Sequence, residues 1–340
     1  MDKLVNQPDL NGYWLKKHVL VTGAGGFIGS HLVETLVRNG AQVRAFVRYN
    51  SRADPGLLTV LPPDIINKIE IVRGDLRDQA AIEEASHEID LIFHLGALIA
   101  IPYSYLHPGE VVETNVLGTL NVLLAARKNG VERVVHTSSS EVYGTAIRTP
   151  IDETHPLHGQ SPYSASKIGA DKLVESFYCA YQLPVVTLRP FNTYGPRQSA
   201  RAVIPTIITQ VLTQDYVYLG NLDTKRDFTY VSDTVRGFLF AAMVPGIEGE
   251  VFNLGVGAEI SVRDLAEKIF ELVGKPVQIK TDHQRMRPEK SEVQRLISDN
   301  RIARERLGWS PEVDFHQGLL NTIEWLSENI NRYQPRQYLV

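Results

Sequence analysis

The sequence has few of the features that mark secreted, metal-binding or membrane-spanning proteins. Its single cysteine, Cys179, excludes an internal disulfide framework, and no cysteine and histidine residues have the spacing of a zinc site. The most apolar stretch, residues 91–102, is interrupted by His94 and Gly96 and is too short to span a bilayer. Residues 1–17 lack the apolar core of a signal peptide. We therefore expect a cytoplasmic protein without a metal ion, in which residues 1–17 form a surface extension.

A basic surface is missing as well. The 340 residues include 35 lysines and arginines against 39 aspartates and glutamates, which gives a net charge of −4. This balance indicates no basic surface for binding nucleic acid. A small acidic ligand must then be held by a few local cations. The chain length and the 43% hydrophobic content are typical of a globular protein with one large or two smaller domains.

Short apolar runs alternate with helical patterns from residue 18 onward. The predicted strands are apolar along most of their length, as in a parallel sheet that is covered on both faces. They lie at residues 18–22, 43–47, 69–72, 91–93, 134–136 and 185–188. The first run is followed by Ile28, Leu32 and Leu36 at helical spacing. The sequence thus predicts a doubly wound α/β fold of the Rossmann type.

The pattern changes after about residue 189. It becomes irregular and richer in proline, asparagine and arginine, then helical again at residues 261–273 and 319–330. We therefore predict two domains rather than one. The nucleotide-binding domain takes residues 18–188 and about 228–256, and a smaller substrate domain over the strand ends takes about 189–227 and 257–340.

A glycine-rich turn follows the first predicted strand. Gly23 permits a tight turn, Gly26 lets the backbone approach a pyrophosphate, and Gly29 allows the helix to pack closely on the strand. Phe27 and Ile28 open that helix, whose amino terminus faces the anion. Because the strand and helix context is present, the pattern predicts a dinucleotide site at these five residues.

The ends of the second and third strands bear on the choice of cofactor. An acid normally ends the second strand and binds the ribose hydroxyls of NAD, but here the strand ends at Arg48 without one. Arg48 or Arg52 can bind a 2′-phosphate, which slightly favours NADP over NAD, although both can equally be exposed cations of a loop. Asp75 is the expected partner of the adenine amino group, with Leu76 beside it, but a turn aspartate would look the same.

A tyrosine and a lysine lie one helical turn apart further along the chain. Ser161 is the expected N-cap and Pro162 the first residue of a helix that places Tyr163 and Lys167 on one face. Lys167 should lower the pKa of the Tyr163 phenol and bind the nicotinamide ribose. Ser139 can share a proton with a substrate alcohol. Such a pair alone is usually a surface feature, but together with the glycine turn and Ser139 it predicts dehydrogenase chemistry.

Glu141 adds a carboxylate to this constellation. A phenol beside an ammonium group suffices to remove a proton while a hydride leaves. A carboxylate in the same site indicates a second deprotonation, at carbon. Glu141, with Ser139 and Ser140 directly before it, therefore points to an elimination rather than to simple redox chemistry.

Taken together, these motifs resemble those of a known enzyme family. Residues 23–29, 139–144, 163–167 and 189–197 are similar to the NAD-dependent sugar epimerases and dehydratases, which are extended short-chain dehydrogenases/reductases. The resemblance runs along almost the whole chain from residue 18. In that family epimerases usually carry a small or hydroxyl residue where Glu141 stands, whereas nucleotide-sugar 4,6-dehydratases carry glutamate. The resemblance thus implies a 4,6-dehydratase, with a 4-epimerase as the alternative on the same scaffold.

Finer similarities suggest a substrate. Ser140 and the strand ending at Arg48 resemble the GDP-mannose 4,6-dehydratases, which use NADP. Residues 100–104, 198–206 and 287–293 resemble the dehydratase of legionaminic acid synthesis. That resemblance implies an N-acetylglucosamine nucleotide, carried on UDP or GDP, as the substrate.

The resemblance also implies an order of steps. Tyr163, helped by Lys167 and Ser139, takes the proton of the sugar 4-hydroxyl while C4 passes a hydride to the nicotinamide. Glu141 then removes the C5 hydrogen, the C6 hydroxyl departs as water, and the hydride returns to C6. The cofactor, NAD or NADP, is retained because net redox is zero. Ser140 is a poor acid for the departing hydroxyl, so Glu141 or an acid elsewhere must protonate it.

Cations and an amide in the second half of the chain are candidates for binding the sugar diphosphate. Asn192 can bond it, and Arg226 and Arg287 can offer guanidinium forks to its charge. Arg197 and Arg201 are second choices. Each of these arginines can equally be a solvated surface side chain.

Other residues are expected to be structural. His94 should be a satisfied core histidine, and Thr137 and Asn115 should support the sheet edge and the active-site helix. The helix at residues 163–181 also has an apolar face. A monomer would bury this face itself, but the resemblance implies that it pairs with the helix near residues 119–127 in a homodimer.

Overall fold

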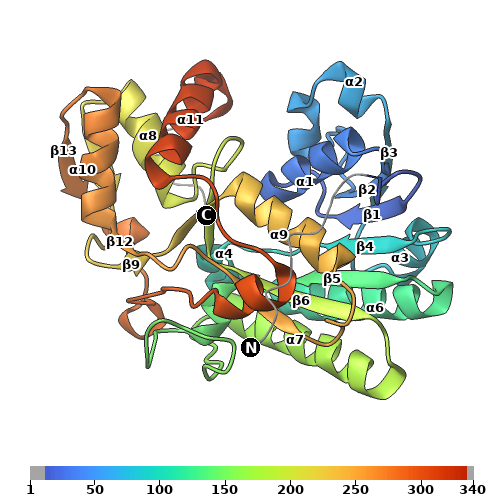
Figure 1. Cartoon of the computed structure of the whole chain (residues 1–340). Helices are drawn as coiled ribbons and strands as arrows, with labels where there is room; N and C mark the ends of the chain where they lie inside the picture. The colour runs from blue at the N-terminus through green and yellow to red at the C-terminus, as the bar shows by residue number, and fades with distance from the viewer. Residues whose placement is uncertain (1–11, 335–340) are drawn as a thin grey trace.

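A parallel sheet of seven strands forms the centre of the molecule, as the sequence predicts (Figure 1). The computed structural model describes residues 12–334. The strand order is β11-β6-β5-β4-β1-β2-β3, and every neighbouring pair is parallel. The strands are β1 (His18–Thr22), β2 (Gln42–Arg48), β3 (Ile69–Gly74), β4 (Leu91–His94), β5 (Arg133–Thr137), β6 (Val185–Pro190) and β11 (Val251–Leu254).

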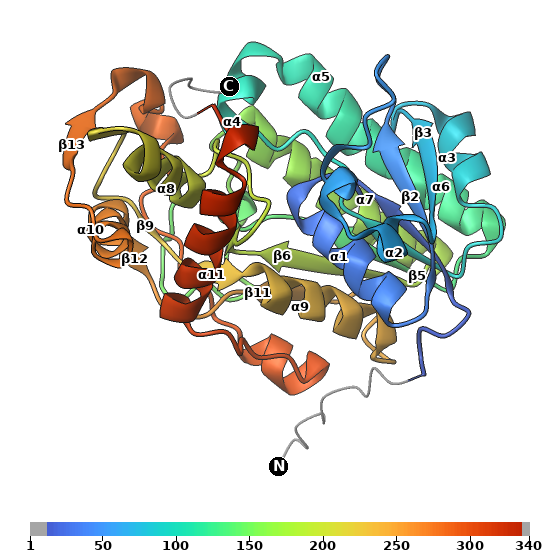
Figure 2. The ribbon, with the colours of Figure 1, turned by 90° about the horizontal axis from the view of Figure 1, so that it is seen from above.

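Helices cover both faces of the sheet (Figures 1 and 2). One face carries α1 (Phe27–Arg38), α2 (Pro63–Ile66) and α9 (Val231–Met243), and the other carries α3 (Gln79–Ala85), α6 (Gly118–Asn129) and α7 (Pro162–Tyr181). Within β1, Val19 and Val21 belong to the core on the first face, and Leu20 belongs to the core on the second. This two-sided burial explains why the strands read as unbroken apolar runs.

Shorter helical segments connect these elements. Three of them lie in series between β4 and α6 and pack beside α7. They are α4 (Ile101–Leu106), α5 (Pro108–Val112) and η2 (Glu113–Leu117). The other short turns are η1 (Gly56–Val60), η3 (Ser140–Tyr143), η4 (His283–Arg285), η5 (Glu289–Ser291), η6 (Ala303–Leu307) and η7 (Ile330–Arg332).

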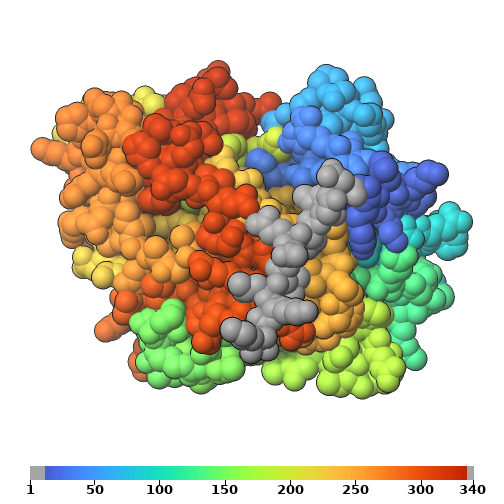
Figure 3. Space-filling view, in the orientation of Figure 1, coloured from blue at the N-terminus to red at the C-terminus, as the bar shows by residue number. Residues whose placement is uncertain are grey.

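A second group of elements has its own core, which includes Ile207, Leu265 and Leu319. Figure 3 shows the orange and red residues of this group beside the blue amino-terminal residues of the described chain. The group follows the carboxyl ends of β6 and β11, since β7 continues from β6 and β12 follows β11. Its helices are α8 (Val203–Thr213), α10 (Val262–Val273) and α11 (Phe315–Glu328). Its strand pairs are β7 (Asn192–Tyr194) with β10 (Phe228–Tyr230), β9 (Lys225–Arg226) with β12 (Ile260–Ser261), and β8 (Tyr216–Leu219) with β13 (Gln278–Thr281).

The structure differs from the sequence prediction at three places. Residues 1–11 of the expected surface extension lie outside the described residues, but Trp14 is fully buried and packs on Phe93. The helix expected at residues 319–330 begins at Phe315, because the Asp314 carboxylate caps its first turn. Leu307 of the predicted substrate domain lies in the core of the large sheet. Trp14 and Leu307 pack against residues that are distant in sequence. Asp314 instead acts locally, since its carboxylate accepts hydrogen bonds from the first turn of the helix.

None of the helices within residues 12–334 combines the length and the apolar character needed to cross a membrane.

Candidate active site

The glycine-rich turn between β1 and α1 is tightly packed, and the first turn of α1 after it carries no acidic residue. Gly23 has a φ of +69°, and a Cβ on it would lie 2.7 Å from the backbone nitrogen of Gly96. A Cβ on Gly29 would lie 2.3 Å from the carbonyl oxygen of Gly23, so only glycine fits there. Gly26 is the N-cap of α1, and no side chain caps the first turn or places an acid in it. The N–H groups of this turn therefore suit the pyrophosphate of a dinucleotide, with Phe27 and Ile28 at the helix start.

The residues expected around the adenosine are engaged in ion pairs. The Arg48 guanidinium, at the end of β2, lies 3.2 Å from the Glu110 carboxylate of α5. Asp75, after β3, accepts hydrogen bonds from Arg77 at 2.7 and 3.0 Å. The Arg77 guanidinium lowers the pKa of the Asp75 carboxyl. Leu76 beside it is buried.

The helix that carries the tyrosine and the lysine begins as predicted. Ser161 is the N-cap and forms a capping box, and Pro162 is the first residue of α7. Tyr163 is 7% exposed and Lys167 is 4% exposed. The Lys167 ammonium donates a hydrogen bond to the carbonyl oxygen of Thr137 at the end of β5, at 2.5 Å. The position of the Lys167 side chain is therefore fixed by two elements: α7 carries it, and the end of β5 accepts its hydrogen bond.

Burial dominates the acid–base properties of this pair. It raises the pKa of Tyr163 to about 12, against a lowering effect of the hydrogen bond with Ser139, while Glu141 and Asp171 raise it further. Burial also lowers the pKa of Lys167 to about 8, although Asp171 opposes this shift. The sequence predicts a lowered Tyr163 pKa, but the pKa is raised, because burial disfavours the phenolate more than its hydrogen bond with Ser139 favours it.

Glu141 lies on the short turn η3, directly after β5. Ser139 caps this turn, and its hydroxyl accepts a hydrogen bond from the Glu141 backbone at 3.2 Å. Ser140 is buried, whereas the Glu141 side chain keeps 14% of its surface exposed. Its carboxylate lies 4.0 Å from the guanidinium of Arg287, which comes from the second group of elements. The Glu141 carboxylate therefore lies between the carboxyl end of β5 and the second group of elements.

The four residues expected to bind substrate gather around one cavity of about 250 Å³. Asn192, Arg201, Arg226 and Arg287 all line it. The Asn192 amide oxygen and one terminal nitrogen of Arg287 are buried without a hydrogen-bond partner within the described structure, as expected for atoms that face a ligand. Arg197, a second choice from the sequence, instead pairs with Glu34 of α1 at 2.5 Å.

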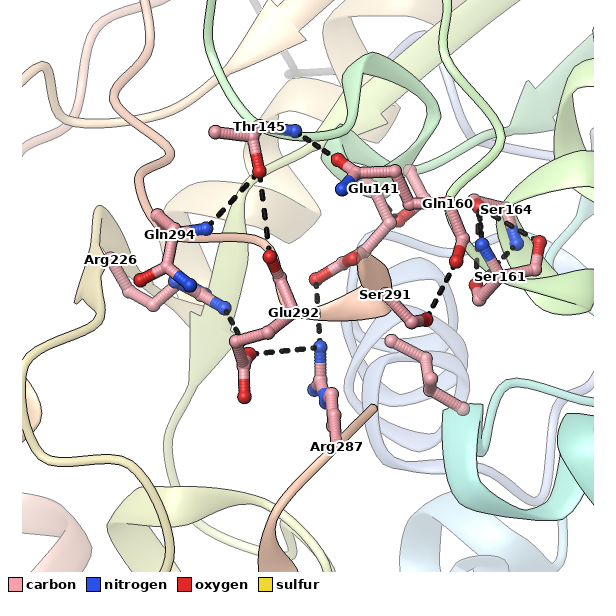
Figure 4. A network of polar contacts seen from close by, with 12 residues as sticks. Glu141, Thr145, Gln160, Ser161, Ser164, Arg226, Arg287, Ser291, Glu292 and Gln294 are labelled. Carbon is pink, nitrogen blue, oxygen red and sulfur yellow. Dashed lines mark hydrogen bonds and ion pairs between the residues drawn. The ribbon is translucent and has the colours of Figure 1, made fainter. Parts of the chain in front are cut away.

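A carboxylate that the sequence did not single out lies inside this arginine cluster. Figure 4 shows Glu292 between the guanidinium groups of Arg226 and Arg287, at 3.7 and 3.8 Å. Arg287 points to both Glu292 and Glu141. Glu292 therefore stands where an anionic ligand of the two arginines would bind. In the sequence, the only indication of Glu292 was that it falls within residues 287–293, one of the segments that carry the resemblance to known dehydratases.

This geometry predicts opposite effects for two substitutions. Arg287→Ala should weaken the binding of free UDP or GDP at least tenfold, because a guanidinium facing the anion is lost. Glu292→Gln should strengthen it about fivefold, because a competing charge worth about 1 kcal/mol is removed. Calorimetric titration measures both.

Glu259→Gln is the matched control for that pair of variants. Glu259 pairs with Arg295 at 2.6 Å and does not line the cavity, so the same charge change there should leave nucleotide binding unchanged. Weaker binding by the Glu292 variant would contradict the role of that residue as a competing anion.

A buried acid on α7 is a second residue that the sequence did not identify. Asp171 is 5% exposed and accepts hydrogen bonds from Ser138 at 2.8 Å and Arg189 at 2.9 Å. It also contacts the imidazole of His136 at 3.2 Å. Asp171 stands one turn after Lys167 on the same helix, and this spacing is the signal that could have found it. It anchors α7 to the ends of β5 and β6.

The expected supporting residues do support the site. The Asn115 amide donates a hydrogen bond to the Ser166 hydroxyl of α7 at 2.9 Å. His94 is buried, with its ring nitrogens 2.8 Å from Thr22 and 3.0 Å from Thr119. Burial lowers its pKa well below the usual value, so it is a neutral core histidine. Among residues 12–334, no three acidic, histidine or cysteine side chains are placed to share a metal ion.

Comparisons with known proteins find relatives along nearly the whole chain. The family model of GDP-mannose 4,6 dehydratase matches residues 20–322. The dTDP-glucose 4,6-dehydratase of Streptomyces antibioticus is 33% identical over 329 residues, which are 94% of this chain and 95% of that protein.

Solved structures include both an epimerase and a dehydratase. The UDP-N-acetylglucosamine 4-epimerase of Methanobrevibacter ruminantium M1 matches with a TM-score of 0.83 and 29% identity, over 93% of this chain and 99% of that one. The dTDP-glucose 4,6-dehydratase of Streptomyces venezuelae, solved with NAD, gives 0.82 and 32%, over 94% and 100%. With its dinucleotide turn and its tyrosine and lysine pair, this chain belongs to the NAD-dependent sugar epimerase/dehydratase family of extended short-chain dehydrogenases/reductases.

Proposed function

We propose that the chain is a lyase, a nucleotide-sugar 4,6-dehydratase that converts a nucleoside-diphosphate hexose to its 4-keto-6-deoxy form. The observation that carries this proposal is the position of Glu141. Glu141 comes after β5, and the end of this strand accepts the hydrogen bond of Lys167. The Glu141 carboxylate lies 4.0 Å from the guanidinium of Arg287, which lines the arginine cavity. A base at this place is needed for elimination and has no part in epimerisation at C4.

The first step is oxidation at C4. Tyr163 takes the proton of the sugar 4-hydroxyl, and Ser139 shares a hydrogen bond with the same oxygen. Lys167, held by the Thr137 carbonyl, binds the nicotinamide ribose. A bound nicotinamide would supply the hydride chemistry, taking the hydride from C4 and returning it to C6 after the elimination.

The second step is loss of water across C5 and C6. The 4-ketone acidifies the C5 hydrogen, and Glu141 removes it. The departing C6 hydroxyl needs a proton, and Ser140 is a poor donor. Glu292 lines the cavity, but its carboxylate is engaged by the guanidinium groups of Arg226 and Arg287. We therefore assign both transfers to Glu141, which takes the C5 proton and gives it to the leaving oxygen. When the hydride returns to C6, C5 takes up a proton from solvent, which completes the 4-keto-6-deoxy product.

The substrate is held by its diphosphate. Arg226 and Arg287 bind its charge, Asn192 donates to its oxygens, and Arg201 lies at the cavity edge. The resemblance in the sequence makes UDP- or GDP-N-acetylglucosamine the first candidate. A relative of known structure is named for UDP-N-acetylglucosamine, which agrees with this choice.

Mass spectrometry of sugar nucleotides incubated in heavy water tests the proposal. UDP-, GDP- and dTDP-sugars are each supplied, and the accepted one should lose water and gain deuterium at C5. A 4-epimerase, the alternative that several relatives support, would leave the mass and the C5 hydrogen unchanged. If every sugar keeps its mass, the dehydratase assignment fails while membership of the family stands.

We also propose a homodimer, with a revised interface. Val174 and Phe177 of the apolar face of α7 are buried in the core of the same chain. This part of the face is therefore not available to a second subunit. Exposed apolar side chains instead lie at the ends of α4, η2 and α7. They are Leu106, Leu117, Tyr178 and Tyr181. Gel filtration should give about twice the 38.1 kDa chain mass. Leu117→Glu should yield the monomer, and elution of the parent at the chain mass would contradict a dimer.

A further inference from the structure

A short turn of the second group of elements, η5, is bonded to the start of the helix that carries Tyr163. The Ser291 hydroxyl, at the end of η5, donates a hydrogen bond to the carbonyl oxygen of Gln160 at 2.6 Å (Figure 4). Gln160 directly precedes Ser161, the N-cap of α7. A serine hydroxyl has one proton to give, so the Tyr105 hydroxyl of α4 donates to the Ser291 oxygen, at 2.7 Å. The buried Ser291 hydroxyl therefore joins η5 to both α4 and α7.

The side chain of Gln160 extends this connection to the turn that carries Glu141. Its amide nitrogen donates to the Lys290 carbonyl of η5 at 3.0 Å. Its amide oxygen accepts a hydrogen bond from the backbone nitrogen of Thr145, which lies two residues after η3. The elements that carry the two proposed bases, α7 and η3, thus both meet η5 at Gln160.

The residues on either side of η5 belong to the arginine cavity. Arg287 precedes η5 and Glu292 follows it, and both line the cavity. Glu292 also contacts Arg226 of β9 at 3.7 Å, and the backbone nitrogen of Lys225 donates to the Gln294 carbonyl at 3.0 Å. The segment is therefore attached to β9 by contacts that do not involve the serine hydroxyl. Loss of that hydroxyl would leave the cavity assembled but weaken its connection to the start of α7.

We infer that Ser291 is a positioning residue, whose hydroxyl fixes the distance between the diphosphate site and the side chains that react with the sugar. The inference rests on the proposed binding of a sugar nucleotide in the arginine cavity, and not on the choice between elimination and epimerisation. Because the sugar is joined to its diphosphate, a shift of the arginines relative to α7 moves C4 away from Tyr163. A misplacement of about 1 Å costs about a hundredfold in rate.

Turnover and nucleotide binding should respond differently to loss of the hydroxyl. Ser291→Ala should lower kcat about tenfold, measured as conversion of the accepted sugar nucleotide to any product, dehydrated or epimerised. Calorimetric titration should show unchanged binding of free UDP or GDP, because the arginines keep their places. Ser291→Thr retains a hydroxyl and should restore kcat. A parent kcat in the alanine variant, or an equal loss of free-nucleotide binding, would overturn the inference.

Amide hydrogen exchange tests the same connection without turnover. Free UDP or GDP should slow exchange in the first turn of α7 in the parent, and Ser291→Ala should abolish this slowing. If the slowing persists in the variant, a different contact carries the connection and the inference fails. A parent that only epimerises, or that converts no sugar nucleotide, would refute the dehydratase proposal, while exchange would still decide the role of Ser291. A parent that binds neither nucleotide would overturn both the diphosphate site and that role.

Two further variants make the result specific. Tyr105→Phe removes only the hydrogen bond to the Ser291 oxygen and should lower kcat about threefold. In the Ser291→Ala background it should add nothing, because Tyr105 acts through Ser291, and an additive loss would contradict this connection. Ser86→Ala is the control: it removes a buried hydroxyl that donates to the Glu83 carbonyl at 3.0 Å and accepts from Asn129 at 2.8 Å, at the end of α3. This variant should keep the parent kcat.

Discussion

Glu141→Gln is expected to reduce water elimination about a thousandfold, the contribution of a well-placed general base. Oxidation at C4 should persist, because Tyr163, Lys167 and Ser139 are untouched. The reduced cofactor and the 4-keto hexose should then accumulate together. Absorbance of the reduced nicotinamide in a single turnover measures the first, and mass spectrometry measures the second. Deuterium from solvent should no longer enter at C5.

The control keeps the carboxylate. Glu141→Asp shortens the side chain by one methylene and should retain measurable elimination. Thermal unfolding of both variants should match that of the parent, since the Glu141 side chain makes no hydrogen bond to the rest of the described chain and contacts Arg287 only at 4.0 Å. Elimination by the glutamine variant at the parent rate would remove Glu141 from the mechanism while leaving the family assignment intact.

Tyr163→Phe is expected to lower turnover about a thousandfold at the first step. Unlike the Glu141 variant, it should accumulate no reduced cofactor, because C4 cannot lose its hydride while the hydroxyl keeps its proton. Burial raises the pKa of Tyr163 to about 12, so the reactive phenolate grows with pH in the parent. The parent kcat should therefore rise with pH, and this rise should be absent from the variant.

Tyr194→Phe removes a comparable buried hydroxyl elsewhere. Tyr194 lies in the core of the second group of elements, where its hydroxyl donates to the Phe315 carbonyl at 3.3 Å. This control should keep the parent pH profile. A Tyr163 variant that reduces its cofactor normally would show that another group removes the proton.

Features that depend on neighbouring residues were predictable from the sequence. The turn at Gly23 needs a positive φ, and the start of α7 needs only Ser161 and Pro162. The parallel sheet follows from apolar runs that can be buried on both faces. Local backbone and hydrogen-bonding preferences decide these features, so a short window of sequence contains their causes.

The acid–base properties of the site were less predictable. The spacing of Tyr163 and Lys167 fixed their common helix face but gave the wrong sign for the tyrosine pKa. That sign depends on how fully the surrounding elements exclude water from the phenol. Helix spacing does not contain this information, because burial is a property of the assembled fold.

The sequence alone therefore determined the sheet, the dinucleotide turn, the helix of Tyr163 and Lys167, and the resemblance that makes Glu141 informative. Only the tertiary structure decided which charges meet. It placed Glu292 between Arg226 and Arg287, and it joined Arg48 to Glu110. The physical reason is that electrostatic interactions act over a few ångströms in space, whatever the separation along the chain. Residues from β2 and α5, or from β9 and the segment directly after η5, become partners only when the fold brings them together.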